Sequence, residues 1–368
     1  MSSEARGGAL RSAALRLLGP ARFAAARSLY RTVSRRELRD PHPLGLKLRA
    51  WQHGFHAASA ALYGVENVES GLYVSDEQRL SRAETLNTIP AALDHKFLLH
   101  SILAARGIKQ AELLAFASRH GILVDPVGQA RYTTRDALAE RLVRERGRYI
   151  WKPESGKRGQ RIVLLEVANG QLVARRGTDM RPFEFPRLRG TVMLLERAVE
   201  QHAFWQALSP FSVNTLRILT LWTPGDAAPF IARAVQRVGT QATLPTDNWS
   251  GGGINALVDL DTGALGPGRV NPYKSGREDR PYTHHPETGA PIQGAVLPNW
   301  PAIADGALAA ARCLPHAPYI GWDVAVDVTG APVVIEGNKN SDMDLLQVHG
   351  GLLADPRIRR FYETCGVL

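Results

Sequence analysis

The sequence predicts an α+β fold, with a helical N-terminal third followed by a mostly antiparallel sheet. Two observations carry this prediction. Apolar residues recur at helical spacing in the segments before residue 145, whereas from Arg148 onward they gather in short strand-like runs separated by turns. Within the second part, Asn169-Gly170 joins two such runs, and Asn-Gly is the strongest short signal for a hairpin. Helices followed by strands in this order are typical of α+β proteins.

The helical third contains four segments whose apolar residues recur at helical spacing: 51–65, 76–89, 93–105 and 109–119. Residues 122–124 (ILV) predict a short strand. Thr134 then predicts the N-cap of a further helix, in which Leu138, Leu142 and Val143 recur at helical spacing.

The sheet part is expected to contain seven strands before its last hairpin, each an apolar run bounded by turn residues: 148–154, 161–167, 171–176, 191–199, 212–222, 229–238 and 254–260. A helix is predicted at 301–313. Segments 239–253 and 264–300 are dense in Gly, Pro, Asn and charge, and long irregular segments of this kind are usually functional or mobile.

The net charge of +10 belongs mainly to an N-terminal arm. Residues 1–52 hold 11 Lys/Arg against 3 Asp/Glu, a net +8, so the other 316 residues carry only +2. We therefore expect no nucleic-acid partner. The arm is expected to be a solvated helical extension; peripheral contact with an anionic membrane surface and a transit peptide are the alternatives.

The compartment is expected to be the cytoplasm. No apolar run approaches the length of a membrane span, and the arm has no uninterrupted apolar core of a secretory signal. Cys313 and Cys365 lie outside any CxxC, so they support neither a disulfide framework nor a zinc site.

The stretch 321–342, GWDVAVDVTGAPVVIEGNKNSD, predicts a hairpin with carboxylates on one face. A two-residue loop, Thr329-Gly330, places Asp323 opposite Glu336, and a four-residue loop gives the same register. Asp327 would then face Pro332, and Asn338 would share the face of Glu336. Two facing carboxylates repel each other, and Mg²⁺ with an Asn oxygen as a third ligand would offset that cost. Two solvated acids on an exposed face are the alternative.

The loop after the strand at 148–154 is suited to hold phosphate. Lys152 ends the strand, and Ser155 and Gly156 open a small, flexible loop whose N–H groups can approach phosphate oxygens. The segment has neither a P-loop nor a dinucleotide-binding pattern. An ordinary hairpin turn is the alternative.

Arginines on apolar strands must pair or reach a ligand, because a buried charge is costly. Arg217 lies in NTLRILTL, and Arg233 and Arg237 lie on the next strand. For Arg217 an internal salt bridge is the alternative to substrate contact. Asn248 in DNWSGGGI (247–254) precedes three glycines that can form an anion nest.

These motifs together resemble the ATP-grasp superfamily. Asp323-x12-Glu336-x-Asn338 is similar to its magnesium triad, and Lys152 with its loop is similar to its second nucleotide lysine and phosphate flap. More narrowly, FSVNTLRILTLW, DNWSGGGI, HPETGAPI, PNW, IGWDVAV and IEGN resemble the sugar-transfer-associated ATP-grasp family over roughly residues 85–350.

The resemblance implies an ATP-grasp fold, in which two α+β lobes clamp a nucleotide, together with a helical N-terminal extension. The expected regions are a basic helical arm at 1–50, a helical region at 51–90, an N-terminal lobe at 91–200 and a C-terminal lobe at 201–368.

The resemblance also implies ATP and Mg²⁺ as cofactors and a role for each candidate residue. Lys96 before a helix would be the first nucleotide lysine. Glu196 to Val199 would bind adenine, with Glu200 or His202 at the ribose. Lys339 adds a cation for phosphate or a substrate carboxylate. Some amide-forming ligases of the superfamily carry an Arg where this chain has Gly321, so Arg217 or Arg233 would have to replace it.

The function so implied is a ligase that activates a small-molecule carboxylate as an acyl-phosphate and passes it to an amine or similar nucleophile. Cell-surface polysaccharide or small-molecule biosynthesis is the implied setting. Two alternatives stay open: a kinase-like phosphotransferase with the same nucleotide site, and a non-catalytic ATP-binding module at the inner membrane surface.

Overall fold

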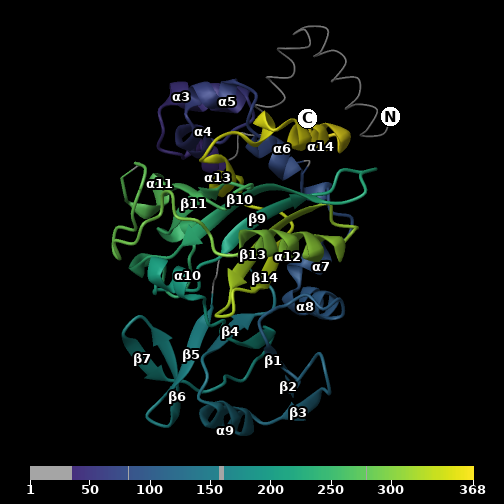
Figure 1. Cartoon of the computed structure of the whole chain (residues 1–368), viewed down its shortest axis with the longest axis vertical. Coiled ribbons are helices and arrows are strands. Elements are labelled where there is room, and N and C mark those ends of the chain that lie inside the picture. The colour runs from purple at the N-terminus through teal and green to yellow at the C-terminus, as the bar shows by residue number, and fades with distance from the viewer. Residues whose placement is uncertain (1–34, 82, 157–160, 279) are drawn as a thin grey trace. The chain divides into compact units, whose positions relative to one another are not determined.

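A computed structural model of the chain describes residues 35–368 except 82, 157–160 and 279 (Figure 1). Residues 1–34, which hold most of the predicted basic arm, lie outside the described residues, so its predicted membrane contact stays a prediction. The contacts divide the chain into two units: one formed by Met1–Leu86 with Asp342–Leu368, and one formed by Asn87–Ser341. No described helix has the length and apolar character needed to cross a bilayer.

The first unit is helical and joins both ends of the chain. Polar contacts tie its two segments together: Tyr63 donates to Asp344 Oδ1 (2.8 Å), and the Gln347 side chain bonds both the N–H (2.8 Å) and the carbonyl (3.0 Å) of Val74. Its helices are α2 (Arg35–Leu38), α3 (Leu44–Gln52), α4 (Ala57–Tyr63), α5 (Val65–Glu69), α6 (Asp76–Ser81), η1 (Ala83–Thr85), α13 (Met343–Gln347), η4 (Leu352–Ala354) and α14 (Pro356–Thr364).

The second unit contains an antiparallel eight-stranded sheet in the order β3-β2-β1-β8-β4-β5-β6-β7. One face packs on α9 (Arg135–Glu145), whose Leu138 and Leu142 join a core with Tyr149 and Trp151. As predicted, Thr134 caps this helix by accepting a hydrogen bond from Ala137 N (3.1 Å). The strands are β1 (Leu113–Ser118), β2 (Gly121–Val124), β3 (Arg131–Thr133), β4 (Tyr149–Pro153), β5 (Val163–Ala168), β6 (Gln171–Arg176), β7 (Asp179–Pro182) and β8 (Met193–Arg197).

The same unit contains a six-stranded antiparallel sheet in the order β12-β11-β10-β9-β13-β14. Helix α12 (Trp300–Arg312) lies against this sheet, and its Trp300 and Ile303 share a core with Ile218 and Trp322 (Figure 1). The strands are β9 (Leu216–Leu221), β10 (Phe230–Val238), β11 (Ile254–Val258), β12 (Leu265–Arg269), β13 (Tyr319–Val326) and β14 (Pro332–Asn338). The remaining helices of the unit are α7 (Ala91–Asp94), α8 (Lys96–Ala104), α10 (Ala203–Leu208), η2 (Gln241–Thr243), η3 (Trp249–Gly251) and α11 (Pro272–Ser275).

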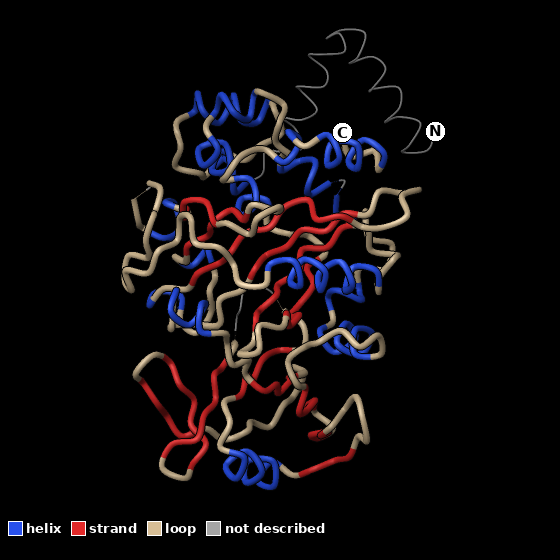
Figure 2. The backbone as a smooth tube through the Cα atoms, in the orientation of Figure 1, coloured by secondary structure: helices blue, strands red, loops and turns tan. Residues whose placement is uncertain are grey.

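The predicted helix at 109–119 is wrong, because residues 113–118 form β1 (Figure 2). The Ala- and Leu-rich run favours a helix locally. In the fold it pairs with β2 on one side and β8 on the other, and its Leu114, Ala115 and Ala117 are buried. Burial between two neighbouring strands therefore overrides the local helix propensity.

The predicted helix at 51–65 is divided in the structure among the end of α3, all of α4 and the first residue of α5. Helices α3 and α4 are separated at Gly54, whose φ of +79° does not continue a right-handed helix.

The last hairpin has the predicted pair but not the predicted loop. Asp323 lies opposite Glu336, which confirms the register at the carboxylates. The loop is different: Asp327 N donates to the Ala331 carbonyl (3.1 Å), leaving three residues in the turn. Pro332 therefore faces Val326 and not Asp327, and an irregularity between Asp323 and Val324 restores the expected register farther along.

Candidate functional site

Asp323 is held by arginines from two neighbouring strands. Arg217 on β9 donates from Nε to Oδ1 (2.5 Å) and from Nη2 to Oδ2 (3.2 Å), and Arg237 on β10 donates from Nη1 to Oδ2 (3.0 Å). Burial raises the pKa of Asp323, but the two guanidinium groups outweigh it and bring the pKa to about 2. Asp323 is therefore a fixed, ionised carboxylate.

Glu336 lies opposite Asp323 and feels its charge. Burial and the Asp323 carboxylate raise the pKa of Glu336 above its usual range. The Asn338 amide donates to the Gly321 carbonyl (3.2 Å) and to Glu336 Oε1 (3.4 Å), so its side chain lies next to Glu336 and its oxygen stays available as an acceptor. The three predicted metal ligands thus lie side by side at the end of one hairpin.

This donor set suits a divalent cation that prefers oxygen ligands. A carboxylate has about four lone-pair positions, and the two arginines make three contacts with Asp323, so Oδ1 can still accept a ligand. A dication would also favour the ionised form of Glu336 that Asp323 disfavours. The described residues include no group of three His, Cys, Asp or Glu side chains that could hold a metal, so Asn338 is needed for a third protein ligand.

Lys96 meets the phosphate-loop segment and the carboxylates. It is the first residue of α8, and its Nζ donates to the Gly156 carbonyl (3.3 Å) and lies 4.0 Å from Glu336 Oε2. Ser155 and Gly156 are exposed at the start of the predicted flap, whose residues 157–160 lie outside the described part of the chain. A lysine, a loop and two carboxylates predicted from separate motifs therefore converge.

Lys152 and Glu196 form a buried ion pair with Nζ and Oε2 2.7 Å apart, and their side chains are 5 % and 9 % exposed. They come from adjacent strands, since Lys152 on β4 faces Leu194 and Ile150 faces Glu196 on β8. The sequence assigns them to phosphate and adenine separately, whereas the structure makes them one donor–acceptor unit.

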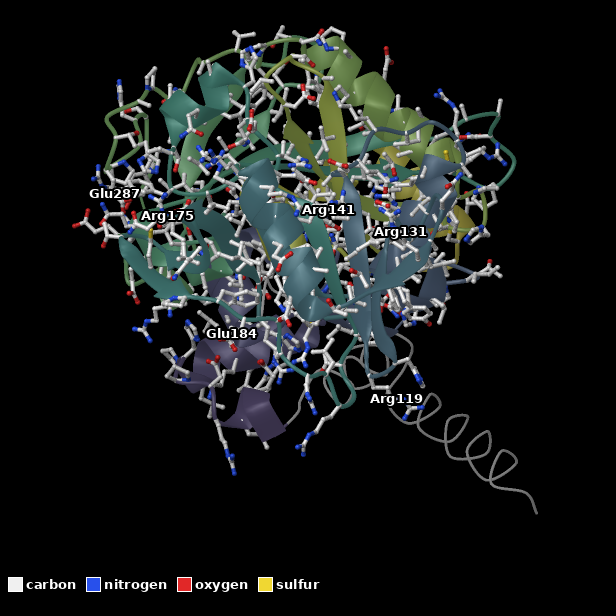
Figure 3. The ribbon with its side chains drawn as sticks, turned by 90° about the horizontal axis from the view of Figure 1, so that it is seen from below. Arg119, Arg131, Arg141, Arg175, Glu184 and Glu287 are labelled. Carbon is white, nitrogen blue, oxygen red and sulfur yellow. The ribbon has the colours of Figure 1, made fainter. Side chains whose placement is uncertain are left out.

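A cavity of about 730 Å³ adjoins the segment that follows β8. Ile150, Leu164 and Val199 line it, together with Arg148 and Arg175. Figure 3 labels Arg175, whose guanidinium also pairs with Glu166 (3.1 Å). The volume of the cavity lies within the range of roughly 300–1,000 Å³ typical of small-molecule sites.

Three predicted site residues form hydrogen bonds with other parts of the protein. His202 is the N-cap of α10 and accepts from Phe204 N through Nδ1 (3.2 Å). Lys339 donates to Asp94 Oδ2 (2.6 Å). Asn248 accepts from Ser250 N (3.2 Å) and caps η3.

The predicted anion nest at Gly251 to Gly253 does not form. All three glycine N–H groups donate to backbone carbonyls of Asn248 or Trp249 within the turn, so none is left for an anion.

Ser341 fills the space left by Gly321, and Arg217 lies beside it. A Cβ at residue 321 would lie 2.6 Å from Ser341 Oγ and 3.3 Å from Arg217 Cδ. Arg217 Nη1 also donates to Ser341 Oγ (3.2 Å). Arg233 on β10 lies opposite Leu219, which is two residues farther along β9 than Arg217. Of the two predicted alternatives, Arg217 is the one placed directly at Asp323.

Two residues of the site were not predicted to lie at the carboxylates: Arg237 and Asp247. Arg237 also donates from Nη2 to Asp247 Oδ1, and Asp247 is buried. The only sequence signal was the presence of an arginine on an apolar strand, which Arg233 shares. The pairing of residue 237 with residue 323 follows from strand order, which no local pattern gives.

The fold defines an ATP-grasp protein, with two antiparallel sheets and a hairpin of facing carboxylates in the second of them. A model of the family described as sugar-transfer associated ATP-grasp matches residues 81–362. The chain therefore belongs to the sugar-transfer-associated ATP-grasp family, as its motifs predict.

No curated protein matches the chain. Among solved structures it is similar to L-amino acid ligase from Bacillus licheniformis (12% identity, TM-score 0.34, 68% of this chain and 41% of that chain). It is also similar to D-alanine–D-alanine ligase from Bacillus anthracis (12%, 0.38, 74% and 66%) and to the ATP-grasp ligase PsnB in complex with a precursor variant, Mg and ADP (14%, 0.36, 86% and 70%). The chain spans less than two thirds of the first two proteins.

Proposed function

We propose that the protein is a Mg²⁺-dependent ATP-grasp ligase that joins a small-molecule carboxylate to an amine or similar nucleophile. The observation that carries the proposal is the convergence at the last hairpin. The Gly156 carbonyl and Glu336 Oε2 both lie within 4.0 Å of Lys96 Nζ, and Asp323 lies directly opposite Glu336. Lysines and carboxylates in this arrangement suit a triphosphate with its cation.

The nucleobase is proposed to lie in the cavity beside Val199. The adenine edge presents a donor at N6 next to an acceptor at N7. Glu196 supplies an acceptor and Lys152 a donor, 2.7 Å apart, which complements that edge. The apolar side chains of Ile150 and Leu164 line the cavity and suit a flat ring, and Glu196 lies next to it as the strand partner of Ile150.

The chemistry then depends on positioning and charge. A bound Mg²⁺ would be held by Asp323, Glu336 and Asn338 and would neutralise charge on the phosphates. The substrate carboxylate oxygen attacks the γ-phosphorus, and ADP leaves as the bond from the β,γ-bridging oxygen breaks. The nucleophile then attacks the acyl carbon, loses a proton, and releases phosphate. Lys96 lies where it would stabilise phosphate charge in the first step.

The family description supports, as part of the proposal, a setting in sugar transfer or cell-surface polysaccharide biosynthesis. The acid or the nucleophile would then belong to a sugar or a sugar-linked precursor.

A second candidate is a phosphotransferase that ends after the first transfer. Gly321 favours it, because the position at which some amide-forming ligases carry an arginine has no room for a side chain beside Ser341 and Arg217. Arg217 would have to supply that charge for ligation.

Crossed panels of amino acids, sugar acids and amines with Mg²⁺-ATP, read as ADP release and by mass spectrometry, test the proposal. A ligase gives ADP, phosphate and a condensed product, whereas a phosphotransferase gives ADP and a stable phosphorylated product. If no combination releases ADP and Mg²⁺-ADP does not bind, the proposal is wrong.

A further inference from the structure

Arg237 joins the metal-ligand candidate to an irregular segment. Its Nη1 donates to Asp323 Oδ2 (3.0 Å) and its Nη2 donates to Asp247 Oδ1. The side chain is 13 % exposed, and its pKa is held above its ordinary value by the two carboxylates despite the opposing effect of burial. Each carboxylate receives a different nitrogen of one planar guanidinium.

Asp247 belongs to segment 239–253 and anchors that segment to β9. Its Oδ2 accepts from both the N–H (2.8 Å) and the hydroxyl (2.6 Å) of Thr215. The backbone of the segment packs closely here, since a Cβ on Gly253 would lie 2.9 Å from the Asp247 carbonyl. Asp247 is therefore packed closely against the glycine turn that follows it.

Asp323 Oδ2 is shared by two donors, Arg217 Nη2 at 3.2 Å and Arg237 Nη1 at 3.0 Å. Arg217 has further bonds to Asp323 Oδ1 and Ser341. Arg237 Nε, by contrast, is buried without a hydrogen-bond partner in the described part of the chain. Of the two arginines, Arg237 is therefore the one with an unused donor, and its bonds to each carboxylate come from a single nitrogen.

We propose that Arg237 is a positioning residue that couples metal loading at Asp323 to the conformation of segment 239–253. The inference rests on the proposed function. A cation on Asp323 Oδ1 neutralises that carboxylate and repels the Arg237 guanidinium that bonds Oδ2, so the guanidinium moves toward Asp247 and tightens the segment. The chain of contacts is Asp323, Arg237, Asp247 and Thr215.

The change Arg237→Lys isolates the coupling. Lysine keeps the positive charge but is a point charge without the two-pronged geometry, so it cannot hold both carboxylates at once. Asp247→Asn removes the charge at the other end and leaves the Arg237–Asp323 contact. Arg141→Lys is the matched control, because Arg141 pairs with Glu145 on α9 (2.8 Å), away from the site.

Amide hydrogen exchange in 239–253 with ADP plus EDTA and with Mg²⁺-ADP, beside calorimetric Kd values, reads the coupling. In the wild type and Arg141→Lys, Mg²⁺-ADP is expected to slow exchange about tenfold and ADP alone is not. Arg237→Lys is expected to raise the Kd for Mg²⁺-ADP about 10–100-fold, as loss of a residue supporting a metal ligand does. At saturation both Arg237→Lys and Asp247→Asn are expected to lose the protection.

Protection that persists in Arg237→Lys or in Asp247→Asn at saturating Mg²⁺-ADP would overturn the inference alone. A wild type that binds Mg²⁺-ADP without slowing exchange in 239–253 would do the same. A wild type that binds no Mg²⁺-ADP would overturn the proposed function and the inference together. Thermal unfolding of each variant shows whether it is folded, and Asp247→Asn carries the test if Arg237→Lys does not fold.

Discussion

Asp323 and Asp327 lie four positions apart on one hairpin, and their surroundings give them different tasks. Asp327 Oδ1 accepts from the N–H groups of Thr329 (3.0 Å) and Ala331 (3.1 Å), and its Oδ2 pairs with Lys109. Burial opposes ionisation, but these contacts bring the pKa of Asp327 to about 2. Asp327 therefore shapes the turn, whereas Asp323 faces a second carboxylate.

Asp323→Asn is expected to lower Mg²⁺-dependent ATP turnover at least about a hundredfold. A metal ion contributes several kcal/mol to stabilising transferred charge, and each 1.4 kcal/mol is a factor of ten. Steady-state ADP release measures the loss. Asp327→Asn is the control and should lower stability while turnover stays near wild type; unchanged turnover in Asp323→Asn would remove that residue from the metal site.

Glu196→Ala is expected to lower the free energy of unfolding by about 3–5 kcal/mol, because it leaves the Lys152 ammonium buried without its partner. The double variant Lys152→Met/Glu196→Leu should recover most of that loss, since an apolar pair can replace a buried ion pair. Urea unfolding measures both. A double variant no more stable than Glu196→Ala would contradict this account.

At the level of elements, the predictable parts were those specified by local chemistry. Asn169-Gly170 has positive φ at both residues, as its hairpin turn requires, and Thr134 caps its helix. The strand at 113–118 could not be predicted, because its Ala- and Leu-rich sequence favours a helix until two neighbouring strands bury it.

The hairpin that carries Asp323 and Glu336 lies between these cases. Alternation and turn residues predicted that Asp323 lies opposite Glu336. The actual loop has three residues and shifts the pairing by one, and the irregularity between Asp323 and Val324 shifts it back. Arg237 and Asp247 could not be placed, because their contacts depend on which strands become neighbours.

The turn at 285–290 gives a pH dependence at the same scale. His285 accepts the Glu287 (3.2 Å) and Thr288 (3.1 Å) N–H groups at Nδ1, and its Nε2 lies 3.0 Å from the Gly239 carbonyl. This requires a neutral ring, and burial lowers the pKa of His285 below 6.5. The unfolded chain then binds the proton first, so stability is present above about pH 6.5 and lost as the pH falls toward the folded-state pKa.

His285→Gln is expected to be less stable than the wild type at pH 7.5 and to lose less stability between pH 7 and 5. The difference in slope is at most about 1.4 kcal/mol per pH unit for one proton. Urea unfolding across that range measures it. Equal slopes in both proteins would show that His285 does not titrate on unfolding.

At the level of the whole molecule, ligand binding should be visible as stability. A ligand that binds only the folded state stabilises it by about 2.7 kcal/mol at 100 times its Kd. Mg²⁺-ADP at that concentration should raise the unfolding temperature of the wild type, and EDTA should reverse the part due to the cation. Differential scanning fluorimetry checks this, with Asp323→Asn expected to show no cation-dependent part.

The helical unit is built from both ends of the chain, Met1–Leu86 and Asp342–Leu368, with 255 residues between them. At a synthesis rate of roughly 5–20 residues per second, that gap takes roughly 13–50 s to translate. Tyr63 and Val74 therefore leave the ribosome long before Asp344 and Gln347, their partners, exist. The unit between them can complete its two sheets first, so a segment made later completes the helical unit that a segment made earlier began.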